Sequence, residues 1–176
     1  RIVSPLPGGL EPVIVYVLET DEGLALIDTG IQSKRNLQEL EDGLTARGLS
    51  LADVRHVLLT HGHPDHFGLA AAIAEQAPIT VWAHPDTQDE VERTFEPVEP
   101  SEHPAVDFFR FMGVPERICL QVIVFENFMS LNMRAPIPVD RPIVDGDIVE
   151  LPPWRLRVVE TPGHCPGHVM LLDEPT

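Results

Sequence analysis

The chain has 176 residues, which suits one domain or most of one, and 43% of them are hydrophobic, enough for a core. Its formal net charge of −16 argues against a nucleic-acid backbone as partner, because phosphate binding needs clustered lysine and arginine. No apolar run approaches the length of a membrane span, so no membrane partner is expected. The two cysteines, Cys119 and Cys165, provide no disulfide framework, which favours a reducing, cytoplasmic setting.

The first half of the chain alternates β-rich stretches with stretches of helical periodicity. The predicted strands cover 13–18, 24–27, 54–59 and 79–82, and the predicted helices cover 33–47 and 66–76. His56 is interpreted as preceding the third strand, and it is expected to be exposed. Strand-helix-strand alternation of this kind indicates an α/β sandwich.

A dense group of imidazoles follows the predicted strand 54–59. Residues 60–66 read Thr-His-Gly-His-Pro-Asp-His. In an extended loop His61 and His63 project to the same side, because side chains alternate with period two, so both can hold one ion. Asp65 and His66 would stand beside them at a helix start and could hold a second ion. The alternative is that Asp65 only caps a helix and the histidines are solvated, but the strand-loop-helix context favours a metal site.

Residues 86–135 form a predicted helical insertion with several prolines in its first half. The apolar stretch 118–133 carries large side chains at spacings of three and four, namely Phe125, Phe128, Met129 and Met133. We favour packing in the core or at a dimer face, and a cap over a hydrophobic substrate pocket is a second interpretation compatible with the first. His84, at the preceding strand end, is interpreted as structural rather than as a ligand.

Four segments, taken in order, resemble the metallo-β-lactamase-fold superfamily. They are the apolar strand followed by His-x-His-x-Asp-His at 61–66, the segments 26–30 and 145–147, and Thr-Pro-Gly-His-Cys-Pro-Gly-His at 161–168. The resemblance covers nearly the whole chain and implies the α/β fold of that family, a four-layer αββα sandwich whose second half is incomplete here. It also implies a single domain over 1–176 with the helical insertion at 86–135.

The resemblance further implies which residues form the site. His164 would complete a three-histidine first site with His61 and His63, while a second site would begin with Asp65 and His66. The expected metal ligands are therefore His61, His63, Asp65, His66 and His164. Asp28 would support the metal loop from behind without binding the ion.

Two of the implied residues act on the substrate rather than on the metal alone. Asp65 would orient the nucleophile and help to handle its proton, and His168 would stand in the wall of the site and contact the substrate. Cys165, between His164 and Pro166, is expected beside the ligands, with some sensitivity to oxidation.

The implied activity is that of a metal-dependent hydrolase. Such an enzyme attacks a small-molecule ester, thioester, lactone or amide through a metal-bound hydroxide. Zinc, as one or two ions, is the expected cofactor, with iron or manganese as alternatives. The segment 161–168 looks most like glyoxalase II-like hydrolases, which favours a thioester. An iron-dependent persulfide dioxygenase and a non-catalytic metal-binding module are the competing hypotheses, and a homo-oligomer is possible.

The family normally supplies two further ligands, a bridging aspartate and a final histidine, beyond the matched segments. Asp173 falls where a turn is expected after 169–172, which is too early for the bridge. We therefore expect a longer native protein, in which only the first site is complete within this chain. A sheet without its last strands would also leave an open edge, which invites pairing with another chain.

Overall fold

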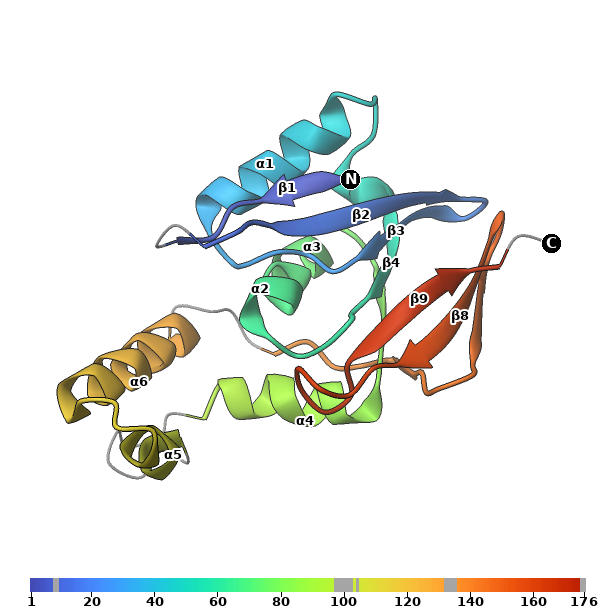
Figure 1. Ribbon diagram of the computed structural model, residues 1–176. Coiled ribbons are helices and arrows are strands. Elements are labelled where there is room, and N and C mark those ends of the chain that lie inside the picture. Colours follow the sequence, from blue (N-terminus) through green and yellow to red (C-terminus); the bar gives the residue numbers. More distant parts are fainter. Residues whose placement is uncertain (8–9, 97–102, 104, 132–135, 175–176) are drawn as a thin grey trace.

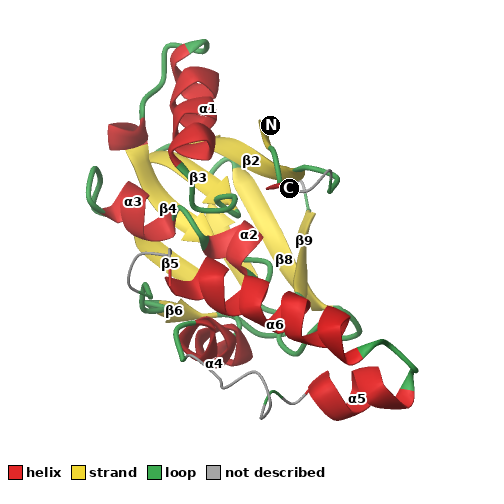
Figure 2. Ribbon diagram, turned by 90° about the vertical axis from the view of Figure 1, so that its left-hand side faces the viewer, coloured by secondary structure: helices red, strands yellow, loops and turns green. Residues whose placement is uncertain are grey.

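The computed structural model describes residues 1–7, 10–96, 103, 105–131 and 136–174, with side chains described up to residue 124 within the last long helix. Two β-sheets pack face to face, and helices cover the outer face of the larger one (Figures 1 and 2). The large sheet has the strand order β1-β2-β3-β4-β5-β6, and the small sheet has the order β7-β8-β9. The α/β sandwich predicted from the alternating elements is confirmed.

The large sheet joins an antiparallel half, β1-β2-β3, to a parallel half, β3-β4-β5-β6. Its strands are β1 (Ile2–Ser4), β2 (Val13–Thr20), β3 (Gly23–Ile27), β4 (Val54–Leu58), β5 (Thr80–Ala83) and β6 (Arg141–Pro142). The small antiparallel sheet contains β7 (Ile148–Leu151), β8 (Trp154–Glu160) and β9 (Val169–Asp173). The helices are α1 (Lys34–Thr45), α2 (Pro64–Phe67), α3 (Ala70–Ala74), α4 (Pro85–Thr94), α5 (Ala105–Phe111) and α6 (Glu116–Leu131), with a short 3-10 helix, η2, at Leu51–Asp53.

Two hydrophobic cores flank the large sheet. Leu40 and Leu44 of α1 pack with Val57 in the core on the helix side. Leu58 packs with Val158 of β8 in the core between the two sheets. Successive side chains of a strand point to opposite faces, so β4 is buried on both sides, as its unbroken apolar run predicts. The end of β4 is thereby held between the helical layer and the second sheet, where the imidazole-rich loop begins.

The single helix predicted over 66–76 is wrong in its extent. The chain forms α2, with His63 as its N-cap residue, and then a separate α3. The backbone N–H of Leu69 donates to the carbonyl of Gly30 at 3.2 Å and to Oγ1 of Thr29 at 3.1 Å, instead of continuing the bonding of α2. A Cβ on Gly68 would lie 2.5 Å from the backbone nitrogen of Gln32, so this glycine lets the loop after β3 reach the helix. Tertiary contact therefore divides the helix.

Two smaller expectations also differ from the structure. His56 lies within β4 and its side chain is only 12% exposed, because it packs edge-on against the ring of Trp82. Asp173 does not lie in a turn but ends β9, where it pairs with Leu156 of β8. Both were predicted from local sequence, which does not show how strands are paired.

Helices α4, α5 and α6 occupy the predicted helical insertion, and α5 and α6 lie beside each other away from the two sheets (Figure 1). The side chains of Phe125, Phe128, Met129 and Met133 lie outside the described residues, so neither interpretation of that apolar stretch is tested. None of the helices in the described part of the chain combines the length and apolar character needed to cross a membrane.

Candidate metal centre

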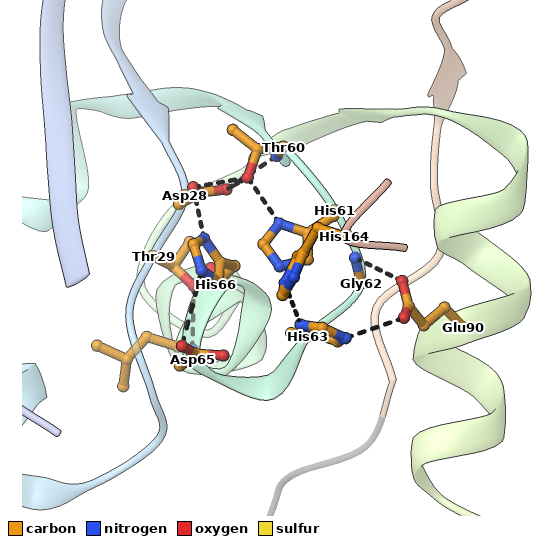
Figure 3. Close-up of polar contacts among 11 residues, drawn as sticks. Asp28, Thr29, Thr60, His61, Gly62, His63, Asp65, His66, Glu90 and His164 are labelled. Carbon is orange, nitrogen blue, oxygen red and sulfur yellow. Dashed lines mark hydrogen bonds and ion pairs between the residues drawn. The ribbon is translucent and has the colours of Figure 1, made fainter. Parts of the chain in front are cut away.

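The imidazole-rich loop after β4 meets two other loops at one edge of the sandwich. Asp28 and Thr29 follow β3, residues 59–63 follow β4, and the loop 161–168 joins β8 to β9. The backbone N–H of Val169 donates to the carbonyl of Thr60 at 2.9 Å, which ties the third loop to the second. Figure 3 shows the side chains that these loops bring together.

Three imidazoles from two distant segments form one group. Ligand atoms of His61, His63, His164 and Cys165 all lie within 4.8 Å of one another. Nδ1 of His63 is 2.9 Å from Nε2 of His164, and the ring of His61 lies 4.6 Å from that of His63 and 5.0 Å from that of His164. The structure thus brings together the three histidines predicted for a first site, with a thiol beside them. One ion could be held by these three side chains.

The surroundings of His61 show whether these residues fit a metal ion. Its side chain is buried, and Nδ1 lies 3.0 Å from Oγ1 of Thr60, whose hydroxyl donates to the Asp28 carboxylate. The threonine oxygen can therefore accept the Nδ1–H of His61, which leaves Nε2 as the bare acceptor. That Nε2 is buried without a hydrogen-bond partner among the described residues. A buried polar atom in this state is costly, and a metal ion shared with His63 and His164 fits it.

The surroundings of His61 and His63 favour the neutral form of both rings, which is the form that binds a metal. Burial, followed by the neighbouring imidazoles, lowers the pKa of His61 to about 2. Burial also lowers the pKa of His63, and this effect outweighs the opposite influence of Glu90. Neutral imidazole nitrogens are ligands that zinc prefers, so a cation could be held by these side chains.

A second pair of donors lies directly beside the first group. Nδ1 of His66 is 2.8 Å from Oδ2 of Asp28, and Nε2 of His66 is 3.7 Å from Oδ2 of Asp65. The rings of His61 and His66 are 4.0 Å apart. Burial disfavours the charged form of His66, but the hydrogen bond that Asp28 accepts, together with the negative charges of Asp28 and Asp65, outweighs burial and raises the pKa of His66. Asp65 and His66 therefore lie beside the first group, and their holding of a second ion stays a prediction.

Asp28 supports the loop from behind, as expected. Its Oδ1 accepts from the backbone N–H of Thr60 at 2.9 Å, while Oδ2 faces His66. The residue has a φ of 59°, a left-handed conformation that aspartate adopts more readily than most residues. One carboxylate thus orients both the first histidine, through Thr60, and the last histidine of the motif.

His168 and Cys165 complete the wall of the site. The His168 ring is 5.0 Å from that of His61, and its Nδ1 lies 2.7 Å from Oγ1 of Thr161. Burial, followed by the influence of the neighbouring His164 imidazole, lowers the pKa of His168. The pKa of the buried Cys165 thiol is raised to about 11 by desolvation and by the nearby Glu90 carboxylate. A thiol of this kind is unreactive in the absence of a metal.

Known proteins resemble this chain over nearly its whole length. A family model described as the metallo-beta-lactamase superfamily matches residues 8–175. The chain belongs to this superfamily. Over 178 residues it is 28% identical to the probable metallo-hydrolase YqjP of Bacillus subtilis (strain 168), with 97% of this chain and 51% of that protein covered. It is 24% identical over 157 residues to the hydroxyacylglutathione hydrolase GloC of Haemophilus influenzae, with 89% of this chain and 58% of that protein covered.

Solved structures agree with the metallo-beta-lactamase fold. The metallo-beta-lactamase family protein TTHA1429 from Thermus thermophilus matches with a TM-score of 0.77 and 30% identity, over 97% of this chain and 54% of that chain. BJP-1, a subclass B3 metallo-beta-lactamase of Bradyrhizobium japonicum, matches with a TM-score of 0.64 and 25% identity, over 90% and 49% respectively. The chain therefore spans about half the length of these curated and structural relatives.

Two further polar side chains belong to α4 and its N-cap. His84 caps α4: its Nδ1 accepts from the backbone N–H of Asp86 at 3.1 Å, and its Nε2 lies 3.0 Å from Glu160. This contact agrees with the structural role assigned to His84. Glu90, on α4, contacts His63 at 3.3 Å and was not identified from the sequence. The one local hint is Gly62, whose missing side chain leaves room for the glutamate.

Acidification is expected to destabilise the metal-free protein through His61. Its pKa falls from an ordinary value of 6.5 to about 2 on folding. Between these values the unfolded chain binds a proton that the folded chain does not, so stability falls with falling pH, by at most about 1.4 kcal/mol per unit for one group. Urea unfolding of chelated wild type and of His61→Gln between about pH 7 and pH 5 measures this. The variant should show the shallower pH dependence, and equal slopes would contradict the assignment.

Proposed function

We propose that this chain carries the metal site of a metal-dependent hydrolase that cleaves esters or thioesters of small molecules. The observation that carries the proposal is the buried, unbonded Nε2 of His61, which lies among the ligand atoms of His63 and His164. Three neutral imidazoles fit zinc, and three-histidine sites leave a coordination position open for reaction. The names of the hydrolase relatives YqjP and GloC point in the same direction.

The described side chains divide the work of hydrolysis between them. When bound, a divalent metal lowers the pKa of a coordinated water to about 7 and polarises the substrate carbonyl. His61, His63 and His164 would hold the ion without adding negative charge, which preserves its acidity. Asp65, whose carboxylate is partly exposed beside His66, would accept a proton from the attacking water. His168 keeps Nδ1 engaged with Thr161, so its Nε2 would bind the substrate.

The thioester is the first substrate class to test. It is supported by the segment 161–168, which resembles glyoxalase II-like hydrolases, and by the similarity to a hydroxyacylglutathione hydrolase. The net charge of −16 disfavours a nucleic-acid substrate. A β-lactam belongs in the same assay, since relatives of similar fold are metallo-beta-lactamases.

The test combines metal content with substrate turnover. We expect elemental mass spectrometry of the purified protein to find about one or two zinc ions per chain, and a glutathione thioester to be cleaved faster than an aryl ester, a lactone or a β-lactam. Chelation should abolish turnover, and added zinc should restore it. Iron with dioxygen-dependent consumption of a persulfide would replace the proposal with an oxidoreductase. Bound metal with no turnover of any substrate would indicate a non-catalytic module.

A further inference from the structure

Glu90 reaches the metal centre from a different part of the fold. It lies on α4, and its side chain is 20% exposed. Its Oε2 accepts a hydrogen bond from the backbone N–H of Gly62 at 3.1 Å, and its Oε1 lies 3.3 Å from Nε2 of His63 (Figure 3). One carboxylate therefore bridges the backbone and the side chain of two consecutive residues in the His-x-His motif.

The motif has room for this carboxylate only because Gly62 lacks a side chain. A Cβ at that position would lie 2.7 Å from both Cβ and Oε2 of Glu90, closer than real contacts allow. The absence of a side chain at Gly62, between the two histidines, thus provides the space that the Glu90 side chain occupies. A loose surface contact would not need such a space.

The contact also determines which nitrogen of His63 faces the other ligands. Nε2 of His63 faces the carboxylate at 3.3 Å, and because a carboxylate only accepts hydrogen bonds, the neutral tautomer that suits this contact has its proton on Nε2. The lone pair of the neutral ring is then on Nδ1, which lies 2.9 Å from Nε2 of His164. Histidine ligands of metals commonly donate their second N–H to a carboxylate, which fixes both the tautomer and the ring orientation.

We propose that Glu90 is a positioning residue of the metal centre, which holds the N–H groups of Gly62 and His63 together and aims Nδ1 of His63 at the position shared with His61 and His164. The inference rests on the metal centre proposed above. It adds a residue outside the predicted ligand set and explains why the acidic helix α4 approaches the loop. Its chemistry is that of orientation, since Glu90 itself does not touch the substrate.

The decisive variant is Glu90→Gln, which keeps the size of the side chain. An amide has one acceptor oxygen and one donor nitrogen, so it cannot accept from both N–H groups. If the amide nitrogen faces His63, the ring proton must move to Nδ1, where it opposes metal binding. Asp89→Asn is the matched control, because it removes one negative charge from an exposed position of the same helix.

Two measurements separate positioning from a general structural effect. Zinc affinity, measured by competition with a chromophoric chelator, should fall by about 10–100-fold in Glu90→Gln and stay near wild type in Asp89→Asn. Long-range proton–nitrogen NMR of the metal-free protein should show the Nε2–H tautomer of His63 in wild type and a shift toward Nδ1–H in Glu90→Gln. The second measurement needs no metal and no activity.

The possible outcomes are distinguishable. Wild-type metal affinity and an unchanged His63 tautomer in Glu90→Gln would overturn the positioning role and leave the metal centre intact. A wild-type protein that binds no zinc would overturn the proposed function, while the tautomer would still test the Glu90 contact. If Glu90→Gln fails to fold, Gly62→Ala displaces the carboxylate by its added Cβ and should weaken zinc binding in the same way. Unchanged affinity in that variant would also count against the proposal.

Discussion

Replacing His61 with alanine is expected to remove tight metal binding and with it the hydrolase activity. His61 is the most buried of the three clustered imidazoles, and its Nε2 has no other bonding partner among the described residues. Loss of a ligand should weaken zinc binding by more than the roughly 10–100-fold that loss of an outer hydrogen-bond partner causes. Because a metal supplies several kcal/mol of transition-state stabilisation, turnover should fall by about 10²-fold or more.

A second buried histidine provides the control for this variant. Nε2 of His56 is also buried without a hydrogen bond among the described residues, although Oε2 of Glu22 lies 3.6 Å from it. His56 lies beside Trp82 and outside the cluster. His56→Ala should lower stability while leaving metal content and turnover per folded molecule near wild type. Elemental analysis and steady-state kinetics of both variants make the comparison. A His61→Ala protein that kept its metal and its activity would refute the proposed function.

Replacing Asp28 with asparagine is expected to weaken the binding of the second ion, at His66, more than the binding of the first. Asparagine tolerates the φ of 59° at this position, and its oxygen can still accept from the backbone N–H of Thr60. Its amide nitrogen would then face Nδ1 of His66, which now lies 2.8 Å from the carboxylate. As a donor it would force the proton of that ring to Nε2 and oppose binding of a metal there. A loss of about 10–100-fold in affinity for that ion is expected.

The same substitution should also cost stability. The Thr60 hydroxyl, which donates to Oδ2 of Asp28 at 2.9 Å, would face the amide nitrogen instead of an acceptor, and a buried group without its partner costs about 1–3 kcal/mol. Zinc titration followed by calorimetry measures the two binding steps, and urea unfolding of the metal-free protein measures the stability. Asp89→Asn, on the surface of α4, again serves as control. Two unchanged binding steps in Asp28→Asn would show that Asp28 does not orient His66.

Local sequence was sufficient for the features that depend on neighbouring residues. The apolar run of β4 predicts a strand buried on both faces, and the spacing of His61 and His63 predicts that they share one side of a loop. The order of the matched segments was enough to indicate the superfamily and to place Asp28, His164 and His168 at the same site. The first two predictions hold because strand periodicity and short loops act over a few residues, whereas the third rests on the resemblance to the superfamily.

Only the tertiary structure decided the features that depend on groups distant in the sequence. Such a group either replaces a local backbone hydrogen bond or occupies the space beside a glycine. The helix after the motif divides because Leu69 bonds to Thr29 and Gly30, a competition that no helical propensity records. Glu90 looks like any acidic residue on an exposed helix until α4 is packed against Gly62. Contacts of this kind also decide which ring nitrogen of each histidine faces the other histidines. The sequence shows that an imidazole is present, but its orientation is set by the groups packed around it.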